Sequence, residues 1–63
     1  MIEAIQIAIS ICRDVEINFL SANALLFEFQ KVEGADAFIS EISTISGRFR
    51  IAQVGKQVFL NLA

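Results

Sequence analysis

The chain has 63 residues, of which 56% are hydrophobic and only 19% are charged, and its formal net charge is −2. This acidic balance argues against non-specific attraction to nucleic acid or to an anionic membrane. A single cysteine and the lack of histidine exclude an internal disulfide and a zinc site built from soft ligands.

The segment from Glu3 to Asp14 is predicted to form a helix. Its isoleucines alternate as in a strand, but its polar residues share one sector of about 100° on a helical wheel. On a strand the same residues would scatter over both faces. The remaining apolar arc is about 220° wide, which is more than one sheet face needs. We therefore expect this helix to be contacted from two sides.

A β-hairpin is predicted next. Val15, Ile17 and Phe19 alternate with polar residues, which indicates a strand. Ser21 to Asn23 forms the expected turn, in which asparagine tolerates a left-handed conformation. The segment from Ala24 to Gln30 is the second strand, with its phenylalanines on one face.

The second half repeats this order. Gly34 is expected to interrupt the strand pattern, and Ala35 to Ile45 forms a second helix that stops at Ser46-Gly47. Two strands between Arg48 and Leu62 flank Gly55-Lys56, whose glycine suits the first position of a type II′ turn.

The order of these elements predicts an α+β domain over residues 1–63, namely a four-stranded, mostly antiparallel sheet with two helices on one face. Its predicted core contains Ile5, Ile9, Val15, Ile17, Phe19, Phe27, Phe29, Phe38, Ile42, Ile45, Phe49, Ile51, Val58, Leu60 and Leu62. The opposite sheet face keeps Leu20, Leu26, Ala52, Val54 and Phe59. An apolar patch there would mark an interaction site.

The two halves of the chain resemble each other. Ile5 and Ile39 are 34 residues apart, as are Ile17 and Ile51, whereas Leu26 and Phe59 are 33 apart. An αββ duplication with units at residues 1–33 and 34–63 would explain these spacings. Chance similarity over so few residues is the alternative.

No residue pattern points to catalysis, a cofactor or a metal. General acid–base chemistry most often uses histidine, which is absent. Glu16 and Glu28 are expected to face each other on adjacent strands, where two solvated carboxylates are favoured over a paired catalytic site. Cys12 ends an apolar helix, so packing is favoured over nucleophilic chemistry.

Arg48 and Arg50 flank Phe49, and a sheet with this pattern can bind single-stranded nucleic acid. The ring and the two arginines have opposite parity, however, so they should lie on different faces. No apolar stretch approaches the roughly 20 residues of a transmembrane helix. The first residues lack the basic region of a signal peptide, and one unpaired cysteine favours the cytoplasm.

These observations predict a non-enzymatic protein-interaction or assembly module that acts as a homo-oligomer, with a dimer as the first expectation, or as a subunit of a larger complex. The candidate contact residues are Ile2, Ile7, Ile11, Leu20, Leu26, Val54 and Phe59. One alternative is a weak single-stranded nucleic-acid-binding regulator that uses Arg48, Arg50 and Lys56. The other is a small-ligand-binding protein or enzyme with a pocket between subunits.

Overall fold

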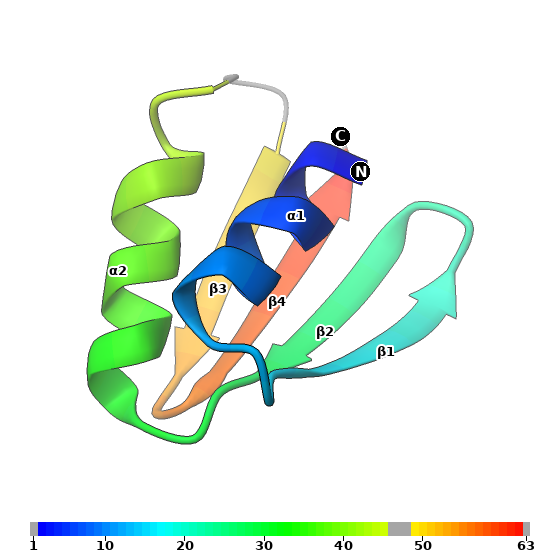
Figure 1. The fold of residues 1–63 in the computed structure, drawn as a ribbon. Helices are drawn as coiled ribbons and strands as arrows, with labels where there is room; N and C mark the ends of the chain where they lie inside the picture. The colour runs from blue at the N-terminus through cyan, green and yellow to red at the C-terminus, as the bar shows by residue number, and fades with distance from the viewer. Residues whose placement is uncertain (1, 46–48, 63) are drawn as a thin grey trace.

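The computed structural model describes residues 2–45 and 49–62, and it confirms the predicted α+β fold. The elements follow the order α1 (Ile2–Ile11), β1 (Glu16–Ser21), β2 (Ala24–Glu28), α2 (Val32–Ile42), β3 (Phe49–Val54) and β4 (Gln57–Leu62). The strands form one antiparallel sheet in the order β1-β2-β4-β3, so the second strand of each hairpin lies at the centre (Figure 1).

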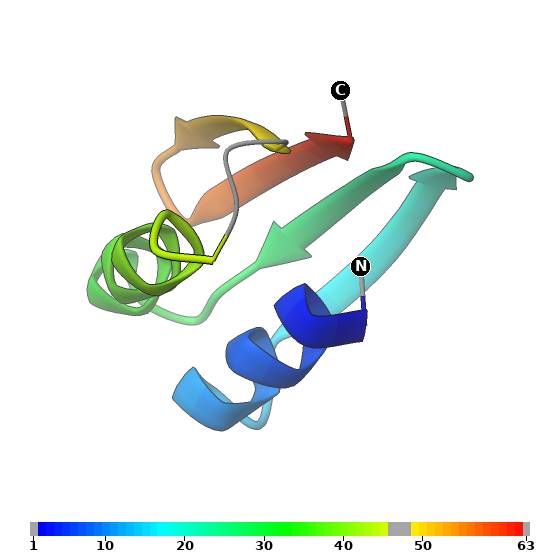
Figure 2. The same cartoon turned by 90° about the horizontal axis from the view of Figure 1, so that it is seen from above.

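Both helices cover the same face of this sheet (Figure 2). α2 lies on the β3 side, and α1 lies beside it, nearer to the middle of the sheet (Figure 1). One hydrophobic cluster fills the space between the helices and the sheet. Its buried residues are Ala4, Ala8, Leu25, Phe27, Phe29, Ala35, Phe38, Ile42, Val58 and Leu60.

Two small side chains, Ala4 and Ala8, form the buried face of α1. Small residues at a packing contact let a helix approach its neighbour closely. Ile5 is half-buried, as predicted for a core residue, but Ile9 is exposed, which corrects its assignment to the core. α1 packs against α2, and its Ala4 and Ala8 belong to the buried cluster that it shares with the sheet, so this helix is contacted from two sides as expected.

The second helix begins and ends earlier than predicted. Gly34 lies inside the first turn of this helix and not before it. A Cβ at Gly34 would lie 3.2 Å from Cδ2 of Phe29, so glycine permits a close approach between helix and strand end. Because the helix ends at Ile42, Ile45 is exposed and not part of the core. The predicted stop at Ser46-Gly47 lies outside the described residues.

The two hairpins use different turns. Gly55 has a φ of 60°, whereas Lys56, like every other described non-glycine residue, does not have a positive φ. This confirms the predicted type II′ turn. In the first hairpin Asn23 is not left-handed, and its N–H donates to Oγ of Ser21 at 3.2 Å. Turns without left-handed residues match the strand twist poorly, and here the register shifts between Phe19 and Ser21.

The burial of the strands corrects one further core assignment. Phe19 pairs with the buried Leu25 and so lies on the helix-covered face, yet it is exposed. The side chain of Leu62 lies outside the described part of the chain. Within the described residues, neither helix combines the length and the apolarity needed to cross a bilayer.

Candidate protein-interaction surface

Several large apolar side chains remain exposed in the folded chain. Ile2 and Phe19 are each 71% exposed, Val54 is 65% and Leu20 is 54% exposed, and Ile9 and Phe59 are exposed to 46% and 37%. They belong to two separate surfaces. We call Ile2, Ile9 and Phe19 the exposed flank, and we call Leu20, Leu26, Val54 and Phe59 the outer sheet face.

The exposed flank lies beside the edge strand β1. Ile2 and Ile9 are seven residues apart on α1, which places them on one stripe. The opposite stripe, with Ile7 and Ile11, packs against the core. α1 lies between α2 and β1 (Figure 1), and Ile2 and Ile9 stay exposed on it. Phe19 stands on the same side of the sheet.

The outer sheet face carries a narrow apolar strip. Pairing across the strands aligns Asn18, Leu26, Phe59 and Ala52 in one row. The neighbouring rows are mostly polar, with Glu16, Glu28 and Gln57 on one side and Asn61 and Arg50 on the other. Val54 ends the first of these rows at the sheet edge. Because polar rows border it on both sides, this apolar strip is smaller than the outer apolar surface that strand parity alone predicts.

Two of the predicted contact residues already pack against the core of their own chain. Ile7 and Ile11 are half-buried against the core and are therefore poorly placed to contact a partner. Sequence reasoning missed Ile9 and Phe19 as surface residues, because both have the spacing of core positions. The signal that could have found them is a comparison with the second half, where the positions 34 residues later are polar.

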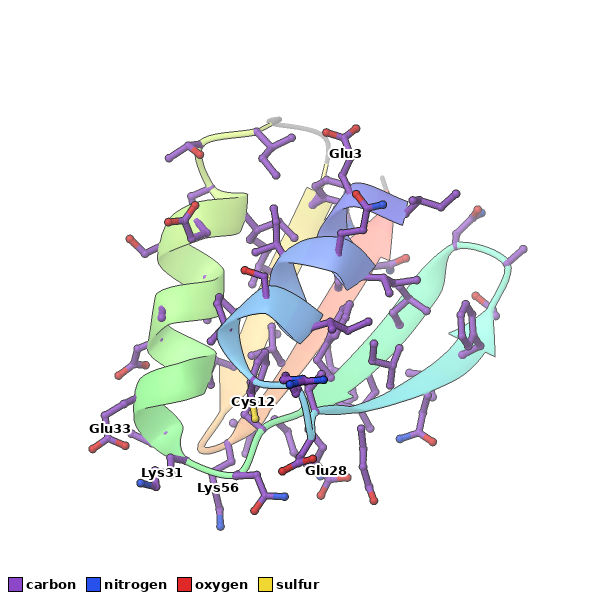
Figure 3. All side chains as sticks on the ribbon, in the orientation of Figure 1. Glu3, Cys12, Glu28, Lys31, Glu33 and Lys56 are labelled. Atoms are coloured by element: carbon purple, nitrogen blue, oxygen red, sulfur yellow. The ribbon has the colours of Figure 1, made fainter. Side chains whose placement is uncertain are left out.

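The two carboxylates expected to face each other do so, since Glu16 pairs with Glu28 between β1 and β2. Both border a shallow pocket of about 200 Å³ that is also lined by Asp14, Phe29, Gln30 and Lys56. Figure 3 shows Glu28 and Lys56 at the same end of the sheet. The described residues contain no group of three or more acidic, histidine or cysteine side chains placed to hold a metal ion.

Cys12 follows the last residue of α1, and its N–H donates to the carbonyl of Ala8 at 2.9 Å. The side chain is half-buried and packs against the core. It also borders a pocket of about 240 Å³ between the end of α1 and the start of α2, whose other lining residues include Phe29, Lys31 and Glu33 (Figure 3). The lining is largely apolar, which suits packing of the Cys12 side chain.

Of the candidate nucleic-acid contacts, the two that the structure describes, Arg50 and Lys56, do not converge on one site. Arg50 is exposed on the outer sheet face, while the half-buried Phe49 packs against the core on the other face, as parity predicts. Lys56 lies in the turn beyond the far end of β3, so some 15 to 20 Å of extended chain separates it from Arg50. Arg48 lies outside the described residues.

No family model, no curated protein and no solved structure matches this chain.

Proposed function

We propose that this protein is a non-enzymatic interaction module that associates with further copies of itself. The observation that carries this proposal is the exposed flank, where two isoleucines of one helical stripe and a phenylalanine of the adjacent edge strand project from the folded chain. Single exposed apolar residues are ordinary in monomers, whereas contiguous patches mark interaction sites.

The size of the chain supports the same proposal. A domain of this length buries about 60% of the surface of its unfolded chain, and association is a common further source of stability. The core is closed by small residues of α1, while larger isoleucines of the same helix remain outside it. Burial of those side chains in an interface would recover apolar contact that the isolated fold leaves unused.

Self-association is tested by sedimentation velocity and by thermal denaturation of the wild-type chain from 1 to 500 µM. Since only the folded form associates, each tenfold rise in concentration should stabilise a dimer by about 1.4 kcal/mol, and its Tm should rise. A monomer throughout this range, with a Tm that does not depend on concentration, would contradict the proposal.

A further inference from the structure

The two hairpins of the sheet correspond residue by residue. In the first hairpin Ile17 pairs with Phe27, and in the second Ile51 pairs with Leu60. The first strands match at a spacing of 34 residues and the second strands at 33, and the single-residue difference falls on the register shift before Ser21. At the centre, Leu26 pairs with its own counterpart Phe59. A local two-fold axis therefore relates the two halves of the sheet.

The buried positions of the helices follow the same spacing. Ala4 corresponds to Phe38 and Ala8 to Ile42, and all four side chains are buried. Both helices thus turn matching positions toward the core. Positions outside the core can be compared between the halves in the same way.

On the exposed flank the two halves differ in chemistry. Ile2, Ile9 and Phe19 correspond to Asp36, Ser43 and Gln53, which are polar and exposed. In the second half Nε2 of Gln53 donates to Oδ1 of Asp36 at 2.8 Å and joins β3 to α2. The fold therefore accepts polar residues at these positions. At the matching positions of the first half the side chains are apolar, which an interface would explain.

The strand next to the exposed flank is open to pairing. β1 is an edge strand, and every second residue directs its backbone N–H and C=O away from β2. Edge strands are commonly blocked by lysine or proline, but the sequence of β1 contains neither and has one charged residue, Glu16. The other edge, β3, carries Arg50 and is flanked by α2 (Figure 1).

We propose that a second copy of the chain pairs its β1 antiparallel with β1, so that the two sheets form one sheet of eight strands, four from each copy. The two-fold axis would stand perpendicular to the sheet, and the exposed flanks of the two α1 helices would pack against each other above it. This inference rests on the proposed self-association and names its surface.

Burial and charge restrict the register, and the register that we propose places Asn18, near the middle of β1, on the axis. Directly opposed residues share a sheet face, so a shift by one residue would turn the helix-covered face outward. With Asn18 on the axis, Ile17 lies opposite the partner's Phe19 under the helices, and Glu16 lies opposite the partner's Leu20. The two Glu16 side chains are then four residues apart along the strands, about 13 Å, which exceeds the screening length of about 8 Å. A register that opposed them directly would be repulsive.

The available surface fits a small dimer interface. The exposed parts of Ile2, Ile9 and Phe19 present on the order of 400 Å², which is comparable to the largest apolar patch on a typical monomer, a patch that is often functional. A standard interface takes about 800 Å² from each partner, roughly one fifth of the 4143 Å² of this chain. The open backbone edge and the polar residues around it would supply the remainder, so we expect association in the micromolar range.

The test transfers the polar residues of the second half to the first. In the variant Ile2→Asp with Phe19→Gln, the dimer dissociation constant measured by sedimentation should rise at least tenfold. Circular dichroism should stay unchanged, because the fold accepts the same residues at the matching positions. Two matched controls, Val54→Gln at the far edge and Phe59→Gln in the outer sheet face, should leave the dimer intact.

A second variant tests the register through a gain of function. Asn18→Cys in a Cys12→Ser background should oxidise readily to a disulfide-linked dimer, because Asn18 faces its counterpart across the axis. Gln53→Cys in the same background should not. If the wild-type dimer is lost in Phe59→Gln but persists in the flank variant, the proposed surface is wrong and self-association stands. If the wild type is a monomer at all concentrations and the cysteine variant does not cross-link, both proposals fail.

Discussion

Replacement of Phe38 by alanine should remove most of the stability of the fold. Phe38 is fully buried, and its ring centroid lies 4.6 Å from that of Phe27 and 5.4 Å from that of Phe29, with interplanar angles of 45° and 42°. It therefore links α2 to the centre of the sheet. Truncation of a buried phenylalanine costs about 3 to 5 kcal/mol, and the loss of two ring contacts places this site near the upper end.

The total stability of the chain sets the consequence. At 0.05 to 0.15 kcal/mol per residue, a chain of this length is stabilised by about 3 to 9 kcal/mol. We therefore expect Phe38→Ala to be largely unfolded at 25 °C unless the wild type lies near the top of this range. Phe38→Leu keeps most of the volume and should lose about 1 to 2 kcal/mol.

Urea denaturation followed by circular dichroism measures both effects, with all proteins at one concentration so that association does not differ between samples. A decrease in the free energy of unfolding of less than about 1.5 kcal/mol in Phe38→Ala would refute the reasoning, because truncation of a buried phenylalanine is expected to cost about 3 to 5 kcal/mol. Both variants are compared with the cooperative urea unfolding transition of the wild-type protein.

Three further experiments test the turn at Gly55, the packing of Cys12 and the absence of nucleic-acid binding. Gly55→Ala should lower stability by about 1 to 2 kcal/mol, since φ is 60° there and no atom lies near enough to interfere with a Cβ; Gly55→Asn should cost less. Cys12 should react with a thiol reagent more slowly in the folded chain than in denaturant, because it packs against the core, and equal rates would contradict this packing. A fluorescent single-stranded DNA oligonucleotide should show no anisotropy change with micromolar protein at physiological salt. Tight, salt-sensitive binding that is lost in Arg50→Ala would overturn that expectation.

Local chemistry was enough to predict the elements of the fold. Alternation with period two identified the strands, and the polar sector of the first segment identified a helix despite its alternating isoleucines. The glycine of Gly55-Lys56 specified its turn, because few residues other than glycine take a positive φ without strain. Parity also placed Leu26, Val54 and Phe59 on the outer sheet face. These features depend on residues close together in the chain.

Only the tertiary structure decided which part of an apolar helix is covered. The wide arc of α1 allows many rotations about its axis, and the structure turns Ala4 and Ala8 inward while Ile2 and Ile9 stay outside. Phe19 has the parity of a core residue, but its burial depends on whether a helix lies above it. Neither property is local, because both follow from how α1, α2 and the sheet share one small core. The exposed flank is therefore a result of packing that periodicity alone does not contain.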